Sequence, residues 1–146
     1  MIVLAFALAF VLYLIAAIHA YWGLGGVWPG TDQASCARAV VGARGIRTMP
    51  TPFACFAVTA CLIVATLWPL ALVGVFATPF PKPGLAASAL MVALVFIGRG
   101  IAGFTPAWRR LSPEMPFARL DRRYYSPLCL VIGTGFVILA FNGFQS

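Results

Sequence analysis

Residues 2–22 read IVLAFALAFVLYLIAAIHAYW and contain no Asp, Glu, Lys or Arg. An α-helix rises about 1.5 Å per residue, so about 20 apolar residues cross the roughly 30 Å hydrocarbon core of a bilayer. This run reaches that length. Because no basic residue precedes it and its apolar core is longer than that of a standard secretory signal, we expect a retained transmembrane helix.

Three further apolar runs have the same character. Residues 53–76 and 127–144 carry no charged side chain, and residues 85–105 are interrupted only by Arg99. In the whole chain 62% of residues are hydrophobic and 9% are charged, whereas a soluble domain has about 25% charged residues. The sequence therefore predicts an all-α fold, an integral membrane four-helix bundle that forms a single transmembrane domain over residues 1–146.

Helix breakers separate the four runs. The segment PFPKPG at residues 79–84 predicts a short hairpin between the second and third helices. Ser126 and Pro127 have the residue types of an N-cap and a first helical position, so we expect the fourth helix to begin there. In the first loop, Thr31 can cap a short helix over residues 32–41 that lies on the membrane surface.

The charge distribution predicts an orientation. Ten basic residues oppose three acidic ones, which gives a net charge of +7. Loop 23–52 carries three arginines and loop 106–126 carries five, whereas the hairpin and the termini carry only Lys82. The positive-inside rule then places both long loops in the cytoplasm and both termini outside. Basic loops beside apolar runs favour the bilayer and its anionic lipid headgroups as partners, and they argue against nucleic acid.

Arg99 is the most informative single residue. It lies about six residues from the cytoplasmic end of its helix, which is roughly 9 Å deep. A charge at that depth is costly and usually faces the bundle or a wet cavity. A structural interpretation is that Arg99 reaches the headgroups or locks helices through carbonyls and Asp121. A functional interpretation is an anion clamp for a carboxylate, a phosphate or a lipid headgroup.

His19, the only histidine, lies one turn from the cytoplasmic end of the first helix, with Trp22 on the same face. It is either a hydrogen-bonded interface residue or a ligand contact and general base, since imidazole changes charge near neutral pH. Neither a second histidine nor a Cys-x-x-Cys pair accompanies it, so we expect no metal site and no redox centre. No cofactor motif is present, and we expect no cofactor.

Asp121 and Tyr125 precede the fourth helix at a spacing of four residues. They either form a juxtamembrane anchor together with the neighbouring arginines or contribute to a cavity at the cytoplasmic side. The predicted topology brings seven polar or aromatic side chains to one depth at that side. These candidate ligand-binding residues are His19, Trp22, Arg44, Arg47, Arg99, Asp121 and Tyr125.

Two stretches, HAYWGLGG at residues 19–26 and DRRYYSPLCL at residues 121–130, carry a family resemblance. The chain resembles a family of small bacterial four-helix membrane proteins catalogued as a domain of unknown function. The resemblance covers most of the chain in order and length. It implies a multi-pass protein of the bacterial cytoplasmic (inner) membrane, and it transfers no catalytic residue.

Three classes of function fit the sequence, and whether the protein is an enzyme stays open. The first, which we favour, is a site at the cytoplasmic face that binds a small anionic lipid or amphiphile, either for binding alone or for processing it as well. The second is a structural or accessory subunit, either a homo-oligomer or part of a larger membrane complex. The third is a small anion transporter or channel. Cation coupling is disfavoured, because no Asp or Glu lies within a predicted span.

Overall fold

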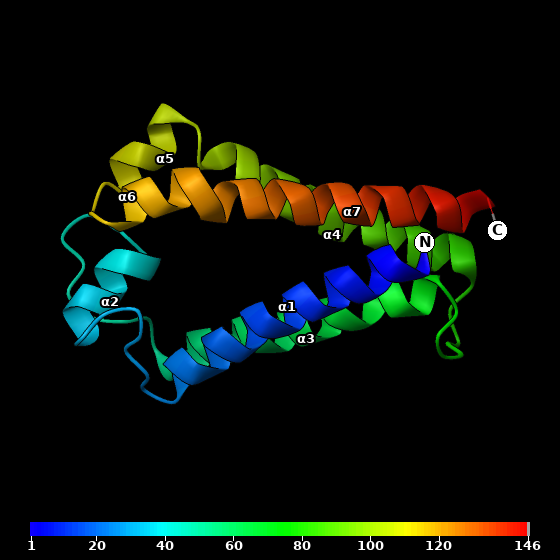
Figure 1. Cartoon of the computed structure of the whole chain (residues 1–146), viewed down its shortest axis with the longest axis horizontal. Helices are drawn as coiled ribbons and strands as arrows, with labels where there is room; N and C mark the ends of the chain where they lie inside the picture. The colour runs from blue at the N-terminus through cyan, green and yellow to red at the C-terminus, as the bar shows by residue number, and fades with distance from the viewer. Residues whose placement is uncertain (146) are drawn as a thin grey trace.

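The computed structural model describes residues 1–145. Their regular secondary structure is entirely helical, without strands (Figure 1). Four of its helices are long and apolar enough to cross a membrane, as predicted, so the chain is a multi-pass membrane protein. Their most apolar windows are only 17–39% buried, so most of their side chains face outward, toward lipid. The four helices are α1 (Ile2–Gly23), α3 (Pro52–Leu72), α4 (Lys82–Ala102) and α7 (Ser126–Gln145).

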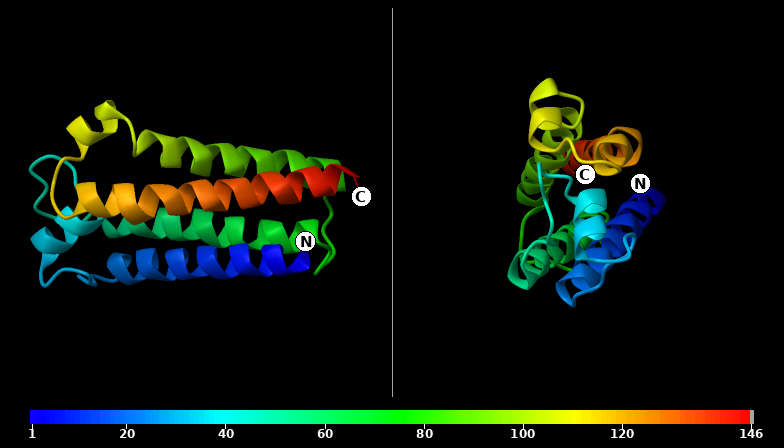
Figure 2. Two further views of the ribbon diagram at one scale, coloured as in Figure 1. Left: turned by 45° about the horizontal axis from the view of Figure 1, so that its top comes forward. Right: turned by 90° about the vertical axis from the view of Figure 1, so that its left-hand side faces the viewer.

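The long helices form two antiparallel pairs. Helix α1 packs against α3, and α4 packs against α7, whereas contacts between the two pairs are much fewer. Both termini lie at one end of the bundle, and the two long loops lie at the other (Figures 1 and 2). The loop end carries α2 (Gln33–Val40), α5 (Pro106–Leu111) and α6 (Phe117–Leu120), and we call it the arginine-rich end.

Two helix boundaries differ from the predicted residues 53–76 and 85–105. Helix α3 ends at Leu72, because Gly74 adopts a positive φ of 75° and Val75 donates its backbone N–H to the Leu70 carbonyl at 3.0 Å. A left-handed glycine with this hydrogen bond is a common helix terminator. Helix α4 spans Lys82–Ala102, so it begins and ends three residues earlier than predicted.

The predicted surface helix of the first loop has a different cap from the expected one. Helix α2 begins after Asp32, whose carboxylate accepts a hydrogen bond from the Ser35 backbone N–H at 2.7 Å. The Ser35 hydroxyl in turn accepts from the Asp32 backbone N–H at 3.1 Å. This reciprocal arrangement satisfies two free backbone N–H groups at the helix start. Thr31 had been expected to fill this role, and it lies one residue outside the cap.

The start of the fourth transmembrane helix was predicted wrongly. Ser126 is not an N-cap, because its backbone is helical and helix α6 continues through a π-helical turn, η1 (Asp121–Tyr125), into α7. The apolar helical segment therefore spans Phe117–Gln145, 29 residues in all. Asp121 and Ser126 of this continuous helix both contact Arg99 of α4. The Ser126 hydroxyl also donates to the Asp121 carboxylate at 3.1 Å. Because the helix begins before Ser126 and its backbone N–H already bonds the Asp121 carbonyl, there is no helix start for Ser126 to cap.

Small residues set the close contact between α4 and α7. A Cβ atom at Gly133 would lie 2.5 Å from Ile97 Cγ1 and 3.0 Å from the Ala93 carbonyl oxygen. Hydrocarbon gives helices no hydrophobic drive to associate, so close van der Waals contact at small residues is a main source of pairing energy. Gly98 of α4 has no atom within 4 Å of the equivalent position. It therefore lies outside the contact.

We expect Gly133→Ala to lower the thermal stability of the protein in detergent by about 1–3 kcal/mol, because the α4 backbone must move to admit the methyl group. Gly98→Ala is the matched control and should leave stability unchanged or slightly raised, since alanine favours helix. Thermal unfolding followed by near-ultraviolet circular dichroism measures both. Equal effects at the two positions would contradict the assigned α4–α7 contact.

Candidate functional site

Arg99 and Asp121 form a buried ion pair between α4 and η1. The Arg99 Nη2 atom lies 2.5 Å from Asp121 Oδ1, and this is the only salt bridge among residues 1–145. The Asp121 side chain is 3% exposed and that of Arg99 is 29% exposed. Two opposite charges at this depth offset each other's loss of hydration, which neither residue could tolerate alone.

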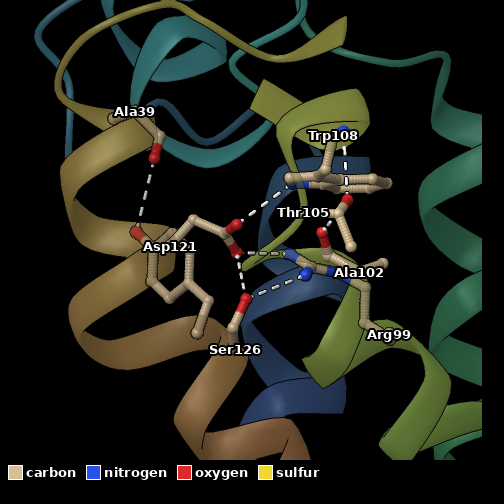
Figure 3. A network of polar contacts seen from close by, with 8 residues as sticks. Ala39, Arg99, Ala102, Thr105, Trp108, Asp121 and Ser126 are labelled. Atoms are coloured by element: carbon tan, nitrogen blue, oxygen red, sulfur yellow. Dashed lines mark hydrogen bonds and ion pairs between the residues drawn. The ribbon is translucent and has the colours of Figure 1, made fainter. Parts of the chain in front are cut away.

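Two further side chains complete the network around the Asp121 carboxylate (Figure 3). The Trp108 indole donates to Asp121 Oδ2 at 3.0 Å, and Arg99 Nη1 donates to the Ser126 hydroxyl at 3.2 Å. The Arg99 guanidinium also stacks over the Trp108 ring, with Cζ 4.6 Å from its centroid. Both carboxylate oxygens therefore have donors, and the Arg99 guanidinium contacts Asp121, Ser126 and Trp108.

The local backbone explains why these groups meet. In η1 the Ser126 backbone N–H bonds the Asp121 carbonyl five residues earlier, which widens the helix by one residue. Opposite this turn lies Gly103, the C-cap of α4, where a Cβ atom would collide with Ser126 and lie 2.9 Å from Asp121 Oδ2. Glycine is thus required for the close approach of the carboxylate to α4.

Tyr125 contributes to a different contact. Its hydroxyl donates to the Ala39 carbonyl of α2 at 3.3 Å, as the dashed line at Ala39 in Figure 3 marks. Its ring lies 5.8 Å from that of Phe117, centroid to centroid. Tyr125 therefore joins the first loop to the fourth transmembrane helix.

His19 and Trp22 lie at a separate place, near the end of α1. The His19 Nδ1 atom is 2.8 Å from the Ile15 carbonyl, and the two rings meet edge to face at 5.0 Å. Both side chains line a cavity of about 250 Å³, the His19 cavity, between α1, α2 and α3. The cavity is lined by His19, Trp22, Val40, Val41, Met49, Pro50, Ala54, Cys55 and Val58.

The last two candidates, Arg44 and Arg47, do not contribute to a shared ligand site. Arg44 joins the two long loops, since its guanidinium donates to the Arg110 carbonyl at 3.2 Å and its backbone N–H donates to the Leu111 carbonyl at 3.1 Å. Arg47 is exposed and has no side-chain partner within residues 1–145. Six of the seven predicted residues are thus distributed over an ion-pair network, an apolar cavity and two contacts of the first loop, and Arg47 belongs to none of these.

A second pocket, which the sequence analysis did not single out, lies on α5, α6 and η1. It has a volume of about 370 Å³, and we call it the arginine pocket. Its lining residues are Arg109, Met115, Ala118, Arg119, Arg122 and Arg123. One signal was available: Arg119, Arg122 and Arg123 are three and four residues apart, which places them on one helical face. Arg109 joins them only through the fold of the loop.

The acidic residues of the chain are all engaged elsewhere. The sequence has three. Asp32 caps α2, Glu114 accepts from the Gly45 backbone N–H at 2.9 Å, and Asp121 binds Arg99. No carboxylate within residues 1–145 pairs with an arginine of the arginine pocket. The pocket therefore concentrates positive charge that the protein itself does not neutralise.

Two groups in the first loop have shifted pKa values. The backbone N–H of Ser35, followed by its side chain, lowers the pKa of Asp32. The cap therefore contributes stability above the ordinary pKa of the carboxyl and loses it as the pH falls through the lowered value. Burial raises the pKa of the Cys36 thiol, whose Sγ lies 3.6 Å from the Trp28 carbonyl. A raised pKa disfavours the reactive thiolate of Cys36. Separately, residues 1–145 contain no cluster of side chains suited to a metal ion.

Comparison with known proteins decides the family. A family model described as a protein of unknown function, DUF3995, matches residues 12–136. The chain belongs to the DUF3995 family. The match includes both of the stretches that carried the resemblance, residues 19–26 and 121–130. No curated protein and no solved structure matches the chain. Within this DUF3995 protein, the first stretch supplies His19 and Trp22 of the His19 cavity, and the second supplies Asp121, Ser126 and two arginines of the arginine pocket.

In this DUF3995 protein we expect Arg99→Met and Asp121→Leu each to destabilise the fold by about 3 kcal/mol, because each leaves a buried, unpaired charge. The double variant should be less destabilised than either single one, since both charges are gone. A double-mutant cycle on thermal unfolding in detergent measures the coupling. Additive losses would show that the two side chains do not depend on each other.

Proposed function

We propose that this protein binds an anionic lipid or amphiphile, through its phosphate-bearing headgroup, in the arginine pocket. The observation that carries the proposal is the gathering of four arginines around one cavity while every acidic side chain is engaged elsewhere. Guanidinium groups bind phosphate oxygens through paired hydrogen bonds, which gives both strength and orientation. Arg99, the anion clamp considered from the sequence, is less suitable because Asp121 already occupies it.

The surroundings of the pocket favour a lipid over a freely diffusing ion. Met115 lines the pocket and is 55% exposed. It is an apolar side chain in a cationic pocket, so it suits the boundary between headgroups and acyl chains. The volume of about 370 Å³ also falls within the usual range for small-molecule pockets.

The orientation is part of the proposal. Eight of the nine arginines lie in the loops of the arginine-rich end, whereas Lys82 lies at the opposite end. The positive-inside rule favours a cytoplasmic position for the arginine-rich end, in the inner membrane of a bacterium, with both termini outside. Anionic lipids of the cytoplasmic leaflet would then meet the pocket directly.

The two other classes of function have weaker support. An anion channel needs a free cation along its path, and Arg99 of α4 is paired with Asp121. An accessory subunit would need a partner protein. The exposed apolar surface of the long helices can be covered by lipid alone and does not require such a partner. Stoichiometric co-purification of a second membrane protein would favour that class.

Trypsin added to intact spheroplasts should leave the loop containing Arg119, Arg122 and Arg123 uncut, because the proposed orientation hides it from the outside. In inside-out vesicles the same protease should cleave there, since all three side chains are exposed. Immunoblotting of the fragments measures the difference. Cleavage in spheroplasts would reverse the orientation.

Phosphatidylglycerol should raise the melting temperature of the purified protein more than phosphatidylcholine at the same mole fraction. In Arg122→Gln/Arg123→Gln most of this difference should disappear, because each arginine near anionic headgroups contributes about 1 kcal/mol. Arg38→Gln/Arg47→Gln removes the same charge outside the pocket and should keep the difference. The affinity of the pocket double variant should fall tenfold or more.

Two outcomes would contradict the proposal. Equal losses in the two double variants would mean that total charge attracts the lipid and that the pocket has no special part. Full stabilisation by inorganic phosphate alone, without lipid, would mean that the pocket takes a free anion.

A further inference from the structure

The His19 cavity has a chemical character opposite to that of the arginine pocket. Among its nine lining residues none is Lys, Arg, Asp or Glu, and most are aliphatic. A charged group placed there would lose its hydration without gaining a counter-ion, which is strongly unfavourable. The cavity is therefore suited to an uncharged ligand.

One side-chain nitrogen of the cavity lining has no partner within residues 1–145. The Nδ1 atom of His19 must carry a hydrogen, because its partner at 2.8 Å is the Ile15 carbonyl, which can only accept. In the neutral ring this tautomer leaves Nε2 as a hydrogen-bond acceptor. His19 makes no second hydrogen bond within residues 1–145.

The neighbouring polar groups are already used. The Trp22 indole N–H donates to the Trp28 carbonyl at 2.8 Å. The Cys55 thiol lies 3.9 Å from the Pro50 carbonyl. Trp22 also packs edge to face against the imidazole, which fixes the orientation of the ring. A ligand would therefore meet one pre-oriented acceptor in an apolar cavity.

The cavity also has a side that reaches the lipid-facing surface. Val58 of α3 lines it and is 42% exposed. Because α3 is a transmembrane helix, a ligand tail that leaves past Val58 would enter hydrocarbon. This geometry suits an amphiphile with its polar end inside and its chain in the bilayer.

We propose that the His19 cavity binds the hydroxyl end of an uncharged long-chain alcohol, with His19 Nε2 accepting the hydroxyl hydrogen. The hydroxyl supplies the donor that Nε2 lacks, and the alkyl chain fills the aliphatic wall. This site shares no lining residue with the arginine pocket, so it does not depend on the function proposed above.

The single histidine makes the test specific. Protein labelled with ¹⁵N-histidine is purified in detergent and titrated with decanol, decyl methyl ether and decanoate, while the two ring nitrogen resonances are recorded. Decanol should shift the Nε2 resonance and leave Nδ1 nearly unchanged, because only Nε2 gains a hydrogen bond. The ether has no donor, and its half-saturation concentration, from competition with decanol, should be about fivefold higher.

A matched pair of variants localises the site. Ala54→Leu places a larger side chain on the cavity wall and should raise the decanol concentration for half-saturation about tenfold. Ala57→Leu adds the same side chain at an exposed position of α3 and should change nothing. The Arg122→Gln/Arg123→Gln protein should respond to decanol like the parent, which separates this test from that of the arginine pocket.

Three results would overturn the proposal: no movement of Nε2 with decanol, equal movement with the ether, or tighter binding of decanoate than of decanol. An unchanged decanol response in folded Ala54→Leu would overturn the assigned position. The alcohol and ether are compared in the parent protein, so this comparison stands even if the Ala54→Leu variant fails to fold.

Discussion

The arginine-rich end of the molecule depends on one buried ion pair. Arg99 Nη2 lies 2.5 Å from Asp121 Oδ1, in a region where neither charge would be tolerated alone. Their pairing explains several local features at once: the π-helical turn that carries Asp121, the glycine at position 103, and the indole of Trp108 that satisfies the second carboxylate oxygen. Helices in hydrocarbon lack a hydrophobic drive to associate, so this polar contact, together with the close packing at Gly133, gives α4 and α7 a defined partner.

The same pair also determines which charges are available to a ligand. The chain has three acidic residues, and each serves a structural contact. The loop arginines consequently have no carboxylate counter-ion within residues 1–145, and four of them line one pocket. The protein therefore has two kinds of arginine. Arg99 holds helices together, and the arginines of the pocket are the ones that we propose for binding an external anion. Beside them, the His19 cavity offers a neutral and largely apolar site.

The sequence was sufficient for the number of transmembrane helices and the all-α class, because hydrophobic length is a strong and local signal. It also suggested Asp121 as a partner of Arg99. The start of α7 was misplaced because Ser126 and Pro127 have cap chemistry, whereas the helix runs on through η1 and the Ser126 hydroxyl is engaged by Asp121 of the same helix and by Arg99 of α4. The arginine pocket was missed because Arg109 is brought to Arg122 and Arg123 only by the folding of α5 and α6. His19 and Arg99 were expected around one cavity, since topology fixes depth but not position around the bundle axis.

The pairing of α1 with α3 and of α4 with α7 has a consequence for biogenesis. Each pair is formed by consecutive transmembrane segments, so each is a complete helical hairpin in chain order. The first hairpin is complete once residue 72 has left the ribosome, before the second hairpin has emerged. Arg99 reaches the bilayer in the second hairpin, and its counter-charge follows 22 residues later on the same half of the chain. The second hairpin therefore contains the counter-charge of its own arginine, so neutralising Arg99 during insertion does not depend on the first hairpin.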